Sequence, residues 1–286
     1  MAIDHDRLFK ELIQTFFEEF ILLFFPDVHE SIDFNQTVFM SEEVFTDVTA
    51  GGKKRVDLLV GTKLKNEPGL IIIHLESQAY KQKNFSDRMF IYFSRLYEKY
   101  RCRILPIAIF SYDKVRNESN EFSLSFPFLD VLKFKFYKVE LKKKQWKDYI
   151  MQDNPVAAAL LCKMGYRKDE RVQVKKEFLR MIIRLELDPA RIQLITGFFD
   201  TYLELNDKEE EALHQEIKKL DPKEEVSIMQ IENSWQKKGK IEGKIEGKIE
   251  TAKNFLAMGL DVATIAKGVN LPEEEVEELK NQLQES

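Results

Sequence analysis

The sequence predicts an α/β core followed by an all-helical C-terminal region. Apolar strand-like runs alternate with amphipathic helical segments up to about residue 141, and helical patterns fill the chain from residue 144 onward. Pro155, Pro189 and Pro222 stand where helices would begin. With 286 residues, 44% of them hydrophobic, the chain is long enough to bury a sizeable core.

The first predicted element is an amphipathic helix from Asp6 to Phe25. Apolar side chains recur along it at spacings of three and four residues, beginning with Leu8. Asp4 or Asp6 is available to cap its start, and Pro26 is expected to end it.

Three strands, forming a meander, are expected next. A short β-like run covers residues 44–48, and Gly51-Gly52 is typical of a hairpin turn into a second strand at 55–61. A turn at 66–69 leads to a third strand at 70–78, whose nearly unbroken apolar start indicates burial on both faces.

A helix and further strands complete the predicted core. The helix spans residues 84–101, with its apolar side chains on one face, and a buried strand comes after it at 104–110. Two more strands are expected at 122–126 and 133–141, so we place the end of the core at residue 143 and its bounds at 1–143.

Two regions lie beyond the core, a helical region at 144–236 and a tail at 237–286. The tail begins with three tandem copies of GKIE at residues 239–250. Four residues are close to one helical turn, so the isoleucines form a narrow, slowly drifting stripe. Two interpretations stay open, a solvated spacer helix or one half of a self-association seam.

Residues 255–283 predict two or three short helices with the outline of a helix-turn-helix. The second of these helices would carry five glutamates between residues 273 and 278. Because phosphates repel such a helix, we interpret the tail as a packing or protein-contact module.

Composition limits the function classes. The net charge of -5 neither supports nor excludes nucleic-acid binding, because such binding depends on a local basic face. Cys102 and Cys162 are too few for a disulfide framework or a metal knuckle. The apolar run at 20–25 is too short to cross a bilayer and the start is acidic, so we expect a cytoplasmic protein without membrane contact.

Carboxylates on two neighbouring predicted strands carry the candidate chemistry. Since side chains alternate along a strand, His74, Glu76 and Gln78 share one face at the end of the third strand. Antiparallel pairing across the intervening turn would bring Asp57 close to Glu76. Two such carboxylates form a hard oxygen site suited to Mg²⁺ or Mn²⁺, which activates water and holds a phosphate.

These residues carry a family resemblance. The order helix, hairpin, strand, helix, strand, with RVDLLVG followed by IIIHLESQ, resembles the PD-(D/E)XK nuclease superfamily. More closely, HLESQ, FSDRMFIYFSRLYEKY and ILPIAIF are similar to the Rpn family of recombination-promoting nucleases, whose members are often labelled transposases. The GKIE repeats followed by NFLAMGLDVATIAKGVNL are also similar to tails in that family.

The resemblance implies a restriction-endonuclease-like core of helix, three-stranded meander, helix and strand within residues 1–143. It also implies a Mg²⁺-dependent deoxyribonuclease that hydrolyses DNA phosphodiesters in recombination or in mobile-element activity. Under this resemblance Asp57 and Glu76 ligate the metal, and Glu11 or Asp6 on the first helix completes its shell.

Three further residues receive roles from the resemblance. Gln78 stands where the family usually has lysine; glutamine can orient water by hydrogen bonding but supplies no positive charge. Arg88 and Tyr92 are four residues apart on one helix face, resemble the family's R-x-x-x-Y pair and are expected to contact the phosphate.

Lysines cluster around the candidate site. Lys53 and Lys54 precede the first carboxylate and Lys81 comes after Gln78, so all three are expected to bind DNA. The segment 133–147 contains seven lysines and one glutamate, interleaved with aromatic residues. It is interpreted either as the lining of a groove for phosphates or as an edge strand that lysines protect from aggregation.

Two other functions remain open from the sequence. A degenerate nuclease would bind DNA without cutting it, which the missing lysine at Gln78 motivates. An interaction protein would use the core as a scaffold for self-association through the C-terminal helices.

Overall fold

The computed structural model describes residues 5–40, 58–64, 67–76 and 85–284, with the backbone alone at 67–68, 70, 72–76, 232–246 and 284. The chain forms two compact units, Met1–Lys219 and Leu220–Ser286. The first unit is mixed α/β, as the sequence predicts, and every regular element described after Glu140 is helical. The expected boundaries at 143 and 236 rest on composition and stay predictions.

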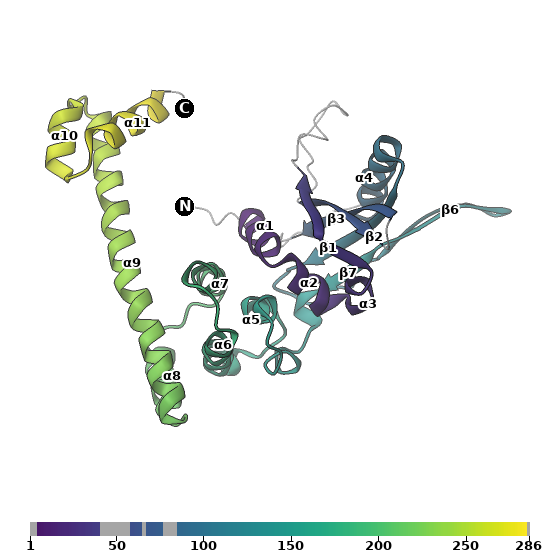
Figure 1. The fold of residues 1–286 in the computed structure, drawn as a ribbon, viewed down its shortest axis with the longest axis horizontal. Helices are drawn as coiled ribbons and strands as arrows, with labels where there is room; N and C mark the ends of the chain where they lie inside the picture. The colour runs from purple at the N-terminus through teal and green to yellow at the C-terminus, as the bar shows by residue number, and fades with distance from the viewer. Residues whose placement is uncertain (1–4, 41–57, 65–66, 77–84, 285–286) are drawn as a thin grey trace. The chain divides into compact units, whose positions relative to one another are not determined.

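Five strands form the main sheet in the order β1-β2-β3-β4-β7. Their bounds are β1 Ile32–Met40, β2 Leu58–Leu64, β3 Glu67–Glu76, β4 Arg103–Phe110 and β7 Tyr137–Glu140. β1, β2 and β3 pair antiparallel, whereas β3, β4 and β7 run parallel. The sheet therefore combines an antiparallel meander, β1 to β3, with a parallel part, β3, β4 and β7 (Figure 1).

The helix α4 (Phe85–Tyr100) connects the parallel strands β3 and β4, and it confirms the helix expected at 84–101. β3 and β4 pair from Gly69 opposite Arg103 to Glu76 opposite Phe110, so both strands end together. A crossover helix runs back against its strands. The first turn of α4 therefore belongs to the same sheet edge as the ends of β3 and β4.

The strand β1 was not predicted. The strand expected at 44–48 and its Gly51-Gly52 turn lie outside the described residues, and in the described part β2 pairs with Ile32–Met40 instead. This segment is half-exposed, contains Asn35 and Gln36, and changes register between Asp33 and Val38. Irregular pairing breaks the two-residue alternation on which strand prediction depends.

The turn expected at 66–69 is wrong at its last three residues, because residues 67–69 lie within β3. Pro68 pairs with Lys63 and Gly69 with Thr62. At Gly69 an added Cβ would lie 2.8 Å from Cδ1 of Leu64. A larger residue would require the Leu64 side chain to move, so this glycine serves close strand packing rather than a turn.

The single strand expected at 133–141 is divided between two sheets. Its first part belongs to β6 (Leu129–Lys135), which pairs with β5 (Glu121–Phe126) in a separate two-stranded ribbon, and its second part is β7. The chain leaves the ribbon at Phe136, which is buried against Phe85 of α4 with ring centroids 5.9 Å apart. Burial of this one side chain marks the change of sheet.

The single helix expected at 6–25 is three helices, α1 His5–Thr15, α2 Phe17–Phe24 and α3 Pro26–His29. The backbone leaves helical geometry at Phe16 (φ -125°, ψ 46°) and at Phe25 (φ -142°, ψ 61°). Phe16, at the break, and Phe17, at the start of α2, are both buried, and Phe17 packs on Phe34 and Phe39 of β1. Pro26 starts α3 instead of only ending a helix.

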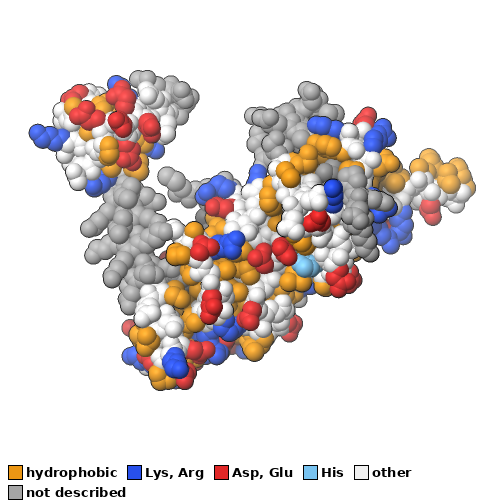
Figure 2. Space-filling model, viewed as in Figure 1, with side chains coloured by type: hydrophobic (Ala, Val, Ile, Leu, Met, Phe, Trp, Pro, Cys, Tyr) orange, Lys and Arg blue, Asp and Glu red, His pale blue; other side chains and the backbone are white. Residues whose placement is uncertain are grey.

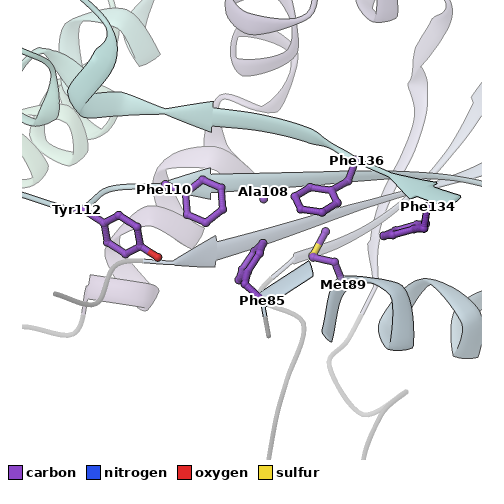
Figure 3. Packing of buried hydrophobic residues seen from close by; sticks show 7 residues of the cluster. All are labelled: Phe85, Met89, Ala108, Phe110, Tyr112, Phe134 and Phe136. Carbon is purple, nitrogen blue, oxygen red and sulfur yellow. The ribbon is translucent and has the colours of Figure 1, made fainter. Parts of the chain in front are cut away.

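An aromatic cluster joins α4 to the sheet and to the base of the ribbon (Figure 3). Phe85 and Met89 of α4 meet Phe110 of β4, Phe134 of β6 and the junction residue Phe136. Full burial of such a side chain contributes about 1.5–3 kcal/mol, so the cluster fixes α4 against the sheet.

Helices make up the rest of the first unit. They are α5 Pro155–Leu160, α6 Arg171–Leu185, α7 Pro189–Tyr202 and α8 Asp207–Ile217, with 3₁₀ turns at 141–143, 146–148, 161–163 and 168–170. Pro155 and Pro189 occupy first helical positions, as does Pro222 in the second unit, so all three predicted starts are confirmed.

The second unit consists of α9 Pro222–Ala257, α10 Val262–Val269 and α11 Glu273–Gln284. The GKIE repeats lie inside the continuous helix α9. Of the two or three short helices expected within 255–283, two are present, and they pack on the end of α9 through a small core: Ala252, Ile265, Ala266, Val269, Val276 and Leu279. Across the described segments, no helix has the length and apolar character that a bilayer span requires.

Asn154 ties the helical region to α2 and provides the first test of this architecture. Its Oδ1 accepts hydrogen bonds from the amides of Val156 (2.9 Å) and Ala157 (3.0 Å), and its Nδ2 donates to the carbonyl oxygen of Glu19 (2.9 Å). We expect Asn154→Ala to lower the free energy of unfolding by about 2 kcal/mol, because a helix cap and a buried hydrogen bond are both lost.

Urea titration followed by circular dichroism measures this loss. Asn154→Asp is the matched control, because it keeps the capping oxygen and loses only the donor to Glu19. Equal stability of Asn154→Ala and the wild type would contradict the assignment.

Candidate metal and phosphate site

Glu76 is the last residue of β3 and lies opposite Phe110 at the carboxyl end of two parallel strands. Its neighbour strand β2 pairs with β3 as far as Leu58 opposite Ile73. The sheet thus holds the backbone of Glu76 in a fixed register at one edge. Carboxyl edges of parallel strands are common ligand sites in α/β proteins.

Most other predicted site residues lie outside the described part of the chain. These are Asp57, Gln78, Lys53, Lys54 and Lys81. Asp57 directly precedes Leu58, the first described residue of β2, and Gln78 is two positions after Glu76. Their roles stay predictions.

Arg88 and Tyr92 both belong to α4 but have different surroundings. The Arg88 Cζ lies 5.4 Å from the ring centroid of Phe85, in the first turn of the helix, and its Nε is buried. Tyr92 is only 4% exposed and packs with Leu59 and Leu96 between α4 and the sheet. The first turn of α4 therefore carries the cation, and Tyr92 contributes to the core.

The two acids offered as further ligands lie on the exposed side of α1. Glu11 is 3.8 Å from the guanidinium of Arg7, one helical turn away. The buried side of α1 packs on α7, where Phe9 meets Phe198 edge to face. In the described segments no three His, Cys, Asp or Glu side chains gather closely enough to hold a metal, and the proposed ligand set stays a prediction.

The lysine-rich segment 133–147 is spread over several elements instead of lining one surface. Lys133 on β6 pairs with Glu121 at 3.2 Å, and Lys147 pairs with Glu170 at 2.8 Å. Lys138 lies on β7, which is an edge strand of the main sheet. For this part of the segment, the observed position agrees with the edge-strand interpretation.

A second group of cations lies around the carboxyl ends of β4 and β7, and it joins part of the lysine-rich segment to Arg116, which the sequence did not indicate. Arg116 stacks on Tyr112, with its Cζ 4.7 Å from the ring centroid. Lys138 and Lys143 share one carboxylate, Glu140, at 3.1 and 2.8 Å. Arg116, Glu140 and Lys143 line a small cavity of about 10 Å³. Lys138 and Lys143 belong to the lysine-rich segment 133–147, whereas Arg116 comes from a separate part of the chain.

Two lysines beside this group lie close together. Lys163 of the short helical turn after α5 contacts Asp113 at 3.0 Å and holds the pKa of that carboxyl below its ordinary value through the hydrogen bond. Burial and the charge of Lys163 lower the pKa of Lys142. The sheet edge that contains Glu76 therefore continues into a surface with more cations than carboxylates.

Glu140 gives this group a measurable pH dependence. Burial raises the pKa of Glu140, but hydrogen bonds from Lys143, Lys138 and the Glu118 amide lower it more, to below the ordinary value of 4.5. A carboxyl with a lowered pKa stabilises the fold above its unfolded pKa, and this stabilisation is lost as the pH falls through the folded pKa.

We therefore expect Glu140→Gln to be less stable than the wild type near pH 7, with a difference that shrinks well below pH 4.5. Urea titrations at several pH values measure the difference, and Glu98→Gln, which removes an exposed carboxylate of α4, is the control. A difference that is constant with pH would contradict the assignment.

Comparison with known proteins gives no match to a family model, to a curated protein or to a solved structure.

Proposed function

We propose that the chain is a metal-dependent DNA endonuclease with a restriction-endonuclease-like core, related in type to the recombination-promoting nucleases that its motifs resemble. The observation that carries the proposal is the position of Glu76. It ends a strand that leaves a meander and enters a crossover through α4 to the parallel strand β4. This order of elements agrees with the one that the resemblance implies.

The geometry of this edge suits an anionic substrate. The first turn of α4 belongs to the same edge as Glu76, and the free amide groups of a helix start attract anions. Arg88 adds a fixed positive charge in that turn. A DNA phosphate bound there would meet both a carboxylate and a cation.

The donor types fit a hard divalent cation. Carboxylate oxygens of Glu76 and Asp57 are ligands that Mg²⁺ and Mn²⁺ prefer, and the paired strand ends give Glu76 a rigid support. When bound, such an ion supplies an activated water and charge stabilisation at the phosphate. In this proposal Glu11 and Asp6 are the candidates for a further ligand.

The other side chains would orient the attacking water and bind the DNA. Gln78 orients the attacking water through its amide, and Arg88 holds the phosphate. Tyr92, buried under the sheet, positions α4 and hence Arg88. Lys53, Lys54 and Lys81, with the cations around Glu140, attract the DNA backbone.

A DNA-binding protein that does not cut is the second candidate. It is favoured by Gln78, which cannot supply the positive charge that lysine would give at this position. The two candidates share the same surface, so affinity for DNA does not separate them.

Cleavage of supercoiled plasmid by the full chain separates them. The nuclease is expected to nick or linearise the plasmid with Mg²⁺ or Mn²⁺ and to stop when a chelator is added. Fluorescence anisotropy with labelled DNA at several salt concentrations measures binding in parallel. Intact plasmid together with salt-dependent binding would favour the second candidate, and the absence of both would reject the two together.

A further inference from the structure

The ribbon formed by β5 and β6 is an arm that is anchored only at its base. Phe122 of β5 stacks on Phe90 of α4 with ring centroids 5.2 Å apart, and Phe134 of β6 meets Phe93 at 5.0 Å. Beyond these contacts the two strands continue away from the sheet (Figure 1). An isolated two-stranded ribbon gains little stability from itself, so an extended arm indicates a binding role.

The tip of the arm is apolar, although hairpin turns usually carry Asn, Asp or Gly. Its two-residue turn is Pro127-Phe128, between Phe126 and Leu129. Phe128 is 84% exposed, Phe126 is 60% exposed, and their rings stack with centroids 5.6 Å apart. Figure 2 shows hydrophobic side chains gathered at the end of this projection. Such a patch is typical of an interaction site.

The base of the same arm borders a mainly apolar pocket. The pocket has a volume of about 300 Å³, and it is lined by Leu105, Pro106, Asn120, Lys135, Phe136 and Tyr137. A cavity of roughly 150 Å³ holds one benzene-sized ring. The pocket is therefore large enough for the two stacked rings of an arm tip.

We propose that the arm mediates exchange between two copies of this chain, with the Phe126–Phe128 tip of each copy in the base pocket of the other. The tip and the pocket lie at opposite ends of the arm. They are separated by the seven residues from Phe128 to Lys135, or about 23 Å. When the arms of two copies lie side by side and antiparallel, the tip of each arm reaches the base pocket of the other copy. This is the self-complementary arrangement of a two-fold dimer.

The charges along the arm fit the same arrangement. Asp130 lies near the tip, whereas Lys135 and the ion pair of Lys133 with Glu121 lie near the base, which leaves one net positive charge there. Antiparallel arms bring the Asp130 of one copy toward the basic end of the other. Between Glu121 and Leu132 the arm has no lysine or arginine, so its outer part is unsuited to nucleic-acid phosphates.

Sedimentation velocity of the full chain over a series of concentrations tests the proposal. We expect a monomer–dimer equilibrium in the wild type, weakened at least about tenfold by Phe128→Asp. Met151→Asp is the matched control, because Met151 is 81% exposed outside the arm, and it should associate like the wild type. The C-terminal unit is intact in all three proteins, so any association of its own is unchanged.

A wild type that stays monomeric throughout the series overturns the proposal, as does a Phe128→Asp variant that associates as tightly as Met151→Asp. The charges give an independent test. Asp130→Lys and Lys135→Asp are each expected to weaken association, and the double variant is expected to restore it. A double variant no tighter than either single variant overturns the antiparallel arrangement.

Discussion

Glu76→Gln is expected to reduce plasmid cleavage by about a thousandfold while leaving DNA affinity close to that of the wild type. The change keeps the shape of the side chain and removes one negative charge from the end of β3. Loss of one group that stabilises transition-state charge typically lowers the cleavage rate by about 10²–10³. Loss of a metal ligand lowers the rate further. Rates at saturating Mg²⁺ measure the effect.

Glu67→Gln is the matched control for this variant. Glu67 is the first residue of the same strand and pairs with Leu64, at the opposite end from Glu76. We expect it to cleave at the wild-type rate. If Glu76→Gln retains more than about a tenth of the wild-type activity, or if both variants lose activity equally, the assignment of Glu76 fails.

Phe199→Ala is expected to lower the free energy of unfolding by about 3–5 kcal/mol. Phe199 is fully buried in α7 and stacks on Phe178 of α6, with ring centroids 3.9 Å apart. Its removal leaves a cavity between two helices that have little freedom to close it.

A buried lysine adds to the cost of this substitution. The Nζ of Lys175 lies 5.1 Å from the Phe199 centroid and 5.4 Å from the Phe178 centroid, and it contacts the carboxylate of Asp200. The two ring faces replace part of the water that the ammonium group loses on burial. Without Phe199 one of these faces is absent.

Urea titration followed by far-ultraviolet circular dichroism measures the loss. Phe128→Ala is the matched control, because it removes the same atoms from a side chain that is 84% exposed. Its expected change is below about 0.5 kcal/mol for the monomer. A loss of less than about 1 kcal/mol in Phe199→Ala would contradict the packing described for α6 and α7.

Features set by neighbouring residues were predictable from the sequence. Prolines at 155, 189 and 222 start helices because a fixed φ and a missing amide hydrogen are harmless there. The amphipathic pattern of α4 and the apolar run of β4 identified both elements within about one residue. Local chemistry alone decides these positions.

Features set by distant contacts were not predictable. β1 is irregular and half-exposed, so its identity depends on pairing with β2. The helix break at Phe16 coincides with packing of the next residue, Phe17, on Phe34 and Phe39 of β1. The split at Phe136 likewise depends on Phe85, which is 51 positions away in the chain.

The candidate site shows the same division. That Glu76 lies at the carboxyl end of a strand agrees with the strand predicted at 70–78 from its apolar run, although β3 ends at Glu76 and Gln78 is outside the described residues. The burial of Tyr92 depends on tertiary packing, as does the approach of Arg116 and Lys163 to the lysine-rich segment at Lys142 and Lys143, and neither has a local signal.

The helix α9 contains three identical tetrapeptides, and identical copies allow the number of copies to change. A twelve-nucleotide gain or loss would keep the reading frame and leave the same residues beside the α10–α11 core. Each step would move that core by about 6 Å along the helix axis and turn it by about 40° relative to the start of α9. Each change in the number of repeats would therefore alter the length of α9, and with it the position and orientation of α10 and α11, by the same fixed amount.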